Sequence, residues 1–169
     1  MSRVEKAYTE EEPTTPKPRT ATLDYKAGSN YIEVIGRVSH KRRRLHFVID
    51  GDVDKLHELP VVFWFHGMFD YSASFVHRQY GILGRSVGAP LPPTDWVAVA
   101  LDRPGYGSST GSWATKEWTY EDFARDVEAV ADAIGVERFY VSGHSSGGPC
   151  ALACAAHIPE RIIGAGVMA

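Results

Sequence analysis

The chain has 169 residues, of which 44% are hydrophobic and 23% are charged, and its formal net charge is −3. These values are typical of one soluble globular domain with a sizeable core. The slight negative charge argues against nucleic acid or an acidic membrane surface as a partner, and no apolar run approaches the roughly 18 to 20 residues that span a bilayer. The acidic start is unlike a targeting peptide, so we expect a cytoplasmic location.

The first segment of the chain is poor in residues that could be buried. It contains "EEPTTPKPRT", which is rich in proline, threonine and charge. Such a composition favours an extended, solvated chain over a packed one. The sequence therefore predicts a disordered tail over residues 1–22 and a folded domain over residues 23–169.

The domain is expected to open with a β-hairpin. "YIEVIGRV" (31–38) and "RLHFVID" (44–50) alternate apolar and polar residues, which is typical of half-buried strands. The link between them, "SHKRRR", is interpreted as a solvated turn. Its basic run also fits a localisation signal or a phosphate-binding patch, and the turn is the preferred interpretation.

The middle of the chain contains continuous apolar runs instead of alternating ones. "VVFWF" (61–65), "WVAVAL" (96–101) and "RFYVS" (138–142) are typical of strands that are buried on both faces. A helix is expected over about residues 73–83, between the first two of these strands. Two antiparallel strands followed by strand–helix alternation predict an open, mostly parallel α/β sheet.

Two further helices have clear start and stop signals. The first covers residues 120–134, with Thr119 as its N-cap, Asp122 three residues later and Gly135 at its end. The second covers residues 146–157 and tolerates a proline in its first turn. One apolar stripe faces the core from the first helix, formed by Phe123, Val127, Val130, Ala131 and Ile134.

Two motifs could be mistaken for cofactor or metal sites. Cys150 and Cys154 have C-x-x-x-C spacing on a predicted helix, which fits neither a zinc site nor a redox pair, so we expect reduced core thiols. "DRPGYGSS" (102–109) is glycine-rich, but no helix opens directly after it, as a dinucleotide site requires. We therefore expect no metal and no cofactor, and interpret Asp102 as a hydrogen-bonded loop anchor.

A possible nucleophile lies between the strand at 138–142 and the helix that follows it. Gly143-His144-Ser145-Ser146-Gly147 fits G-x-S-x-G, in which a sharp, strained turn raises the central serine above the sheet. Gly143 and Gly147 let neighbouring backbone approach closely. The Ser146 N–H, at a helix N-terminus, is a natural oxyanion donor, whereas its side chain is expected to have no role. A plain joint of small residues is the alternative.

A second oxyanion donor is expected in the loop after residues 61–65. His66-Gly67 follows that apolar run directly, and Gly67 allows a tight turn. The Met68 N–H, or that of Phe69, could then point at the same oxyanion. His66 is interpreted as holding this loop by hydrogen bonds, in preference to acting as a general base.

Three motifs, "FHGMF", "DRPGYGSS" and "SGHSSGGPCALACAAHIPERI", occur in an order and spacing that resemble the α/β-hydrolase superfamily from about residue 25 to the end. The resemblance implies an incomplete α/β-hydrolase fold ending near the sixth strand. It also implies hydrolysis of an ester, amide or similar bond of a small-molecule substrate, with Ser145 as the nucleophile that forms an acyl-enzyme. The backbone amides of Met68 and Ser146 would then bind the oxyanion. A central serine argues against the epoxide-hydrolase and dehalogenase branches, which place an aspartate there, and favours the esterase and peptidase-like branch.

The chain departs from this family pattern after the serine. The catalytic triad of this fold occurs along the chain in the order Ser, acid, His. Only 24 residues follow Ser145 here. Their one histidine, His157, precedes their one carboxylate side chain, Glu160. His157 lies roughly 17 Å along the helix from the turn. We therefore expect a fragment of a serine hydrolase that is inactive alone, or else a non-catalytic ligand-binding or interaction module. Trp113, Trp118 and the aromatic residues of "MFDYSASF" could line part of a substrate pocket, but core packing is the preferred interpretation for each. The sequence indicates neither substrate nor oligomeric state.

Overall fold

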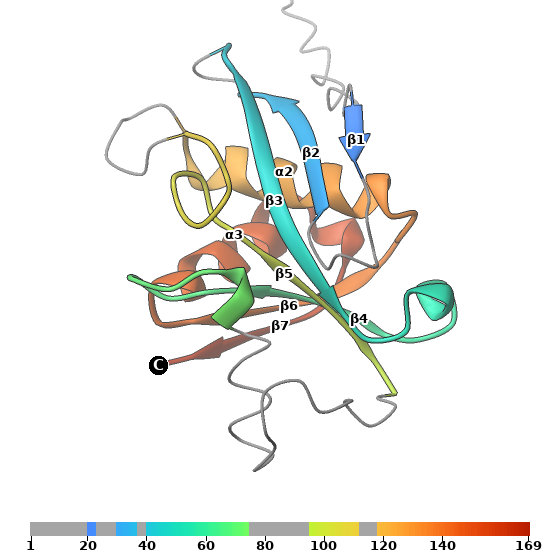
Figure 1. Cartoon of the computed structure of the whole chain (residues 1–169). Helices are drawn as coiled ribbons and strands as arrows, with labels where there is room; N and C mark the ends of the chain where they lie inside the picture. The colour runs from blue at the N-terminus through green and yellow to red at the C-terminus, as the bar shows by residue number, and fades with distance from the viewer. Residues whose placement is uncertain (1–19, 23–29, 37–39, 75–94, 112–117) are drawn as a thin grey trace, which may run out of the picture.

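The computed structural model describes residues 20–22, 30–36, 40–74, 95–111 and 118–169. Within them, the strands form one sheet in the order β1-β2-β3-β5-β4-β6-β7 (Figure 1). The strands are β1 (Thr20–Thr22), β2 (Asn30–Ile35), β3 (Arg42–Asp50), β4 (Val61–Phe65), β5 (Val97–Leu101), β6 (Phe139–His144) and β7 (Ile162–Met168). The pairs β1–β2, β2–β3 and β3–β5 are antiparallel. The pairs β5–β4, β4–β6 and β6–β7 are parallel. The predicted open α/β sheet is confirmed.

Both described α-helices lie behind the sheet in Figure 1 and pack against each other. They are α2 (Tyr120–Ala133) and α3 (Gly148–His157), and short 3₁₀ turns occur at Val53–Lys55, Ser145–Gly147 and Pro159–Arg161. The capping box predicted for α2 is present, because Thr119 and Asp122 each accept a hydrogen bond from the other's backbone N–H. Such a cap stabilises a helix by about 1 kcal/mol. The helix expected at 73–83 lies mostly outside the described residues.

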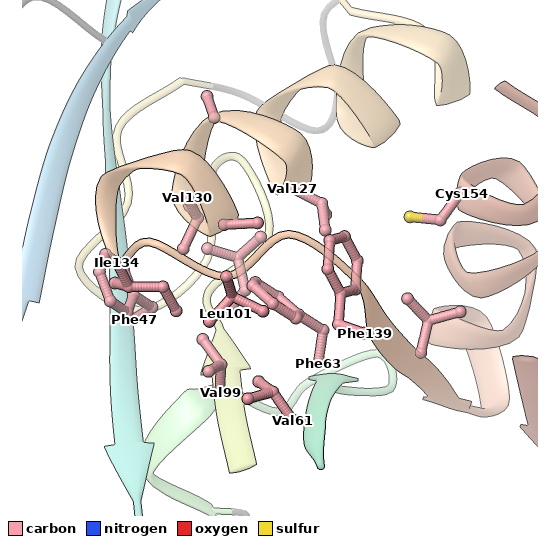
Figure 2. Close-up of a cluster of buried hydrophobic side chains, with 14 of the residues drawn as sticks. Phe47, Val61, Phe63, Val99, Leu101, Val127, Val130, Ile134, Phe139 and Cys154 are labelled. Atoms are coloured by element: carbon pink, nitrogen blue, oxygen red, sulfur yellow. The ribbon is translucent and has the colours of Figure 1, made fainter. Parts of the chain in front are cut away.

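The hydrophobic core lies between the sheet and α2. Figure 2 shows Val127, Val130 and Ile134 of α2 pointing toward strand side chains that include Phe63 and Phe139. The two phenylalanine rings lie 4.6 Å apart, and both side chains are fully buried. Burial of each such side chain contributes about 1.5–3 kcal/mol. This layer fixes β4 and β6, the two strands that precede the candidate site.

The two cysteines belong to this core. Cys150 and Cys154 of α3 are both buried and form no disulfide, as the sequence predicted. Burial raises the pKa of the Cys150 thiol to about 11 and raises that of Cys154 as well. Both thiols are therefore protonated at neutral pH and chemically quiet. Within the described part of the chain, no helix is both long and apolar enough to cross a bilayer.

The predicted tail needs a correction at its end. Residues 1–19 lie outside those described, so their disorder stays a prediction. Thr20–Thr22, however, form β1, which pairs with β2. Pro18 is the last proline before this strand, so every residue of β1 has a backbone N–H that can take part in a ladder. The composition of the whole tail concealed this short pairing segment.

The basic run was also misplaced, because Arg42, Arg43 and Arg44 begin β3 instead of forming a turn. Successive strand residues point to opposite faces of a sheet. Arg43 accordingly points inward and forms a buried ion pair of 2.9 Å with Asp126 of α2. Arg42 remains exposed and pairs with Glu33. The run is therefore divided between the two faces of one strand and forms no single basic patch.

Candidate active site

The loops that carry the candidate residues meet at one edge of the sheet. In the strand register, Phe65 of β4 lies beside Leu101 of β5 on one side and beside Gly143 of β6 on the other. These strands run parallel, so the segments after them, residues 66–72, 102–111 and 144–147, leave the sheet at the same end. That end is on the left in Figure 1.

The turn after β6 has the geometry that the G-x-S-x-G pattern predicts. Ser145 adopts a left-handed backbone conformation, φ +50°, which is strained for a residue other than glycine. Its side chain is exposed. A methyl group at Gly143 would overlap the backbone of Gly147, and one at Gly147 would overlap the carbonyl oxygen of Phe65. The absence of side chains at these two glycines is therefore what allows the turn to form against β4.

The loop after β4 lies directly against this turn. A side-chain atom at Gly67 would lie 3.2 Å from Nδ1 of His144 and 3.4 Å from Cβ of Ser145. Met68, the next residue, is exposed, as Ser145 is. The structure thus brings together the predicted nucleophile and the loop that was predicted to supply an oxyanion donor.

His66 holds this loop in place. Its Nε2 accepts a hydrogen bond of 3.1 Å from the N–H of Arg103, so Nδ1 carries the proton and donates to the carbonyl oxygen of Gly67 at 2.8 Å. The side chain is fully buried, and this desolvation lowers the pKa of His66, which favours the neutral ring. Both nitrogens are occupied, which fits the predicted structural role and leaves neither for a substrate.

Arg103, which the sequence interpretation left without a role, joins the two loops. Its side chain is fully buried, and its Nη2 donates to the carbonyl oxygen of Gly67 at 2.9 Å and to Oγ of Ser146 at 3.1 Å. Its Nη1 donates to the carbonyl oxygen of Ser146 at 3.3 Å. The expectation that the Ser146 side chain has no role is therefore corrected, because its hydroxyl helps to hold a buried cation. The one local sign in the sequence is a charge directly after a buried strand.

Asp102 anchors the loop that carries Arg103, as the sequence predicted. Its carboxylate accepts hydrogen bonds from His46 Nδ1 at 2.7 Å and from the backbone N–H groups of Ser72 at 2.6 Å and Ser108 at 2.8 Å. Burial alone would raise the pKa of Asp102, but these hydrogen bonds outweigh burial and hold it below its usual value. Gly107 is required beside it, since its φ is +52° and a methyl group there would overlap the carboxylate.

Other candidates lie away from Ser145 or outside the described residues. His157 is the last residue of α3 and Glu160 lies in the following 3₁₀ turn. Both are exposed, and both lie at the end of α3 that is far from the Ser145 turn. Trp118 packs against the core, whereas Trp113 is not among the described residues. Core packing is wrong for Phe69 and Tyr71, which are 94% and 47% exposed, whereas Phe75 lies outside the described residues. The tight turn after β4, in which Phe69 has φ +61°, directs that side chain into solvent.

One cavity on the described surface is remote from these groups. It has a volume of about 420 Å³ and is lined by Asp132, Gly135, Val136, Glu137 and Arg161. These residues surround the amino end of β6, whereas Ser145 follows its carboxyl end. Among the described residues, no three His, Cys, Asp or Glu side chains are grouped to hold a metal ion.

Comparisons with known proteins match this arrangement. The family model described as alpha/beta hydrolase fold matches residues 60–165. A "Serine hydrolase-like protein" of Danio rerio is 33% identical over 106 residues, which cover 63% of this chain and 29% of that protein. "Epoxide hydrolase B" of Mycobacterium tuberculosis is 30% identical over 121 residues, covering 72% of this chain and 31% of that protein.

A solved structure agrees with the sequence relatives. The structure titled "Epoxide hydrolase from an endophytic Streptomyces" superposes with a TM-score of 0.59 and 26% identity, covering 83% of this chain and 37% of that one. The chain therefore spans about a third of the length of the relatives that it matches.

Proposed function

Because this chain belongs to the alpha/beta hydrolase fold family, we propose that it provides the nucleophile and the oxyanion pocket of a serine hydrolase. A base takes the hydroxyl proton of Ser145 as its oxygen attacks the carbonyl carbon of an ester, amide or similar bond in a small-molecule substrate. The bond to the alcohol or amine then breaks, that group leaves with the proton, and an acyl-enzyme remains. The backbone N–H groups of Met68 and Ser146 stabilise the negative oxygen of the tetrahedral intermediate. The observation that carries the proposal is the strained, exposed Ser145 packed against the Gly67 loop.

The proposed reaction needs a base that the described residues do not bring to Ser145. His66 is buried and both its nitrogens are hydrogen-bonded, and His157 lies at the far end of α3. A serine hydroxyl without a base is a weak nucleophile. We therefore assign the histidine and its acidic partner to a further segment of a longer protein or to a second chain, in the Ser, acid, His order of this fold.

The relatives carry names from more than one chemistry. One is called a serine hydrolase-like protein and others are called epoxide hydrolases. The family resemblance implies an aspartate at the centre of the turn in the epoxide-hydrolase branch, and this chain has Ser145 there. An ester or amide is therefore the preferred substrate class, because a serine oxygen that attacks a carbonyl forms an acyl-enzyme that water can hydrolyse.

A complementation experiment tests this function. The chain is produced alone and as a continuous protein with the coding sequence downstream of Ala169, and turnover of p-nitrophenyl acetate is measured. We expect turnover only in the longer protein, and Ser145→Ala to reduce it by about 10⁴-fold or more. The matched control is Ser108→Ala, because the Ser108 side chain is exposed and its backbone alone contacts Asp102. Unchanged turnover in Ser145→Ala would contradict the proposal.

A non-catalytic ligand-binding or interaction module is the second candidate. It is favoured by the observation that both ring nitrogens of His66 are already hydrogen-bonded and that His157 lies at the far end of α3. Exposure of Phe69 and Met68 beside the turn would suit an apolar ligand. Labelling of Ser145 by a fluorophosphonate in the longer protein would count against this candidate, whereas tight ligand binding without turnover would support it.

A further inference from the structure

We propose that Arg103 is a positioning residue that orients and polarises the oxyanion pocket from behind. This inference rests on the proposed function, because it assigns a role to a residue next to the Met68 and Ser146 amides. The guanidinium is fully buried. It contacts Gly67, the residue before Met68, and it also contacts Ser146 itself.

The first contact acts on the peptide that carries the Met68 N–H. In a trans peptide the carbonyl and the N–H point in opposite directions. The carbonyl oxygen of Gly67 accepts hydrogen bonds from Arg103 Nη2 and from His66 Nδ1, at 2.9 and 2.8 Å. The Met68 N–H is thereby aimed away from the guanidinium. A charged donor on the carbonyl also strengthens the opposite N–H as a donor, because linked hydrogen bonds polarise one another.

The second contact holds the other donor. Arg103 donates to both the carbonyl oxygen and the hydroxyl of Ser146, at 3.3 and 3.1 Å. Gly67 and Ser146 follow different strands, β4 and β6, so one rigid guanidinium sets the spacing between the two donors. A lysine ammonium would supply the charge but not the planar geometry that reaches all three oxygen atoms.

Arg103 is itself held before any substrate arrives. Its backbone N–H donates to His66 Nε2, its guanidinium carbon lies 4.7 Å from the centre of the Tyr106 ring, and the neighbouring Asp102 is anchored by three hydrogen bonds. Preorganised donors need no rearrangement as charge develops, and a buried cation acts more strongly than an exposed one. The arrangement therefore favours a preset pocket.

The test compares Arg103→Lys with Arg161→Lys in the longer protein of the complementation experiment, which supplies the base. Arg161 is a matched control because it also donates to backbone carbonyls, those of Glu137 at 2.6 Å and Val136 at 3.0 Å, but at the opposite end of β6. One readout is the second-order rate of Ser145 labelling by a fluorophosphonate, whose phosphoryl oxygen occupies an oxyanion pocket. The other is the proton chemical shift of the Met68 amide, which does not depend on reaction.

We expect Arg103→Lys to slow labelling by about 10- to 100-fold, less than the 10²- to 10³-fold loss on deleting a donor, and to move the Met68 amide proton upfield. Arg161→Lys should leave both readouts unchanged, even if both variants melt at lower temperature. Unchanged labelling and an unchanged Met68 shift in a folded Arg103→Lys would overturn the inference.

A second variant keeps the inference testable if Arg103→Lys fails to fold. Ser146→Ala removes one acceptor of Arg103 and keeps the backbone amide, so it should slow labelling by about threefold, and an unchanged rate would overturn the inference. Failure of the longer parent protein, with unaltered Arg103 and Ser146, to react at Ser145 would instead count against the proposed function. In that case the Met68 amide shift still reports whether Arg103 polarises the Gly67–Met68 peptide.

Discussion

The two sides of β6 differ sharply in how completely they are filled. Around the Ser145 turn, a methyl group at Gly143 would overlap the backbone of Gly147, one at Gly147 would overlap the end of β4, and Arg103 is fully buried nearby. Toward β7, apolar side chains face solvent: Ile163 is 45%, Val167 54% and Met168 48% exposed. Leu152 of α3 adds a further exposed apolar side chain. We call this set of four residues the β7 face.

The difference shows which part of the candidate site is self-contained. The turn at Ser145 and the loop after β4 are held by contacts of His66 and Arg103, all of which lie within the described residues. The β7 face has the character of an interface, because exposed strand edges and apolar patches favour pairing. Strands added to β7 would extend the same carboxyl edge that carries Ser145, which is where we place the missing base.

The largest expected effect comes from adding one methyl group on each side of β6. Gly143→Ala should lower the free energy of unfolding by about 3 kcal/mol or prevent folding, because the methyl overlaps backbone that cannot move aside. Gly166→Ala on β7 is the matched control, since its methyl would lie an ordinary 3.7 Å from Ser142 Oγ. Urea denaturation measures both. Equal losses would show that the two sides are packed alike.

The second-largest effect is expected from a change at Asp102, which anchors the loop that carries Arg103. Asp102→Asn replaces one acceptor oxygen by an amide that faces donors from His46, Ser72 or Ser108. We expect a loss of about 2 kcal/mol in the free energy of unfolding. The loss should shrink in acid, because the lowered pKa of Asp102 means that its stabilisation is present above pH 4 and disappears as pH falls through the folded pKa. A constant loss down to pH 2 would contradict this assignment.

The part of the site that the sequence predicted depends on local patterns. The capping residues of α2, the G-x-S-x-G turn and the His66-Gly67 pair all lie within a few positions of the structure that they specify. Short-range spacing is enough to indicate such features. The apolar runs likewise indicated buried strands, because burial on both faces leaves no polar alternation.

The part that the sequence missed depends on distant contacts. Arg103 lies 36 positions from Gly67 and 43 from Ser146, and no local pattern shows that one side chain reaches both. The Arg43–Asp126 pair spans 83 positions in the same way. β1 was missed because its pairing with β2 uses backbone hydrogen bonds, which leave no distinctive pattern of side chains in the sequence. These features follow from the tertiary arrangement and not from periodicity.

A third prediction uses the buried Arg43–Asp126 pair, which lies away from both sides of β6. Burial raises the pKa of Asp126 to about 7, despite the opposing effect of Arg43, against an ordinary 3.8. The folded state therefore holds this proton more tightly than the unfolded state does. The associated stability is full below about pH 4 and is lost as pH rises through 7, with a slope of at most about 1.4 kcal/mol per pH unit.

Asp126→Asn should flatten this part of the stability curve, as measured by urea denaturation at pH 4, 5, 6 and 7. Asp102→Asn is the useful contrast. Because the pKa of Asp102 is lowered instead of raised, this variant should change the pH dependence of stability below pH 4 and not between pH 4 and 7. An unchanged slope between pH 4 and 7 in Asp126→Asn would mean that another group titrates there.

The smallest effect on stability is expected on the β7 face. The variant Leu152→Gln with Val167→Thr replaces two side chains that are 58% and 54% exposed, so its free energy of unfolding should change by less than about 0.5 kcal/mol. The same change should reduce self-association in sedimentation velocity, because it removes apolar area from an open sheet edge. A loss above 2 kcal/mol would instead mean that these side chains are packed within the folded chain, and the contrast between the two sides of β6 would no longer hold.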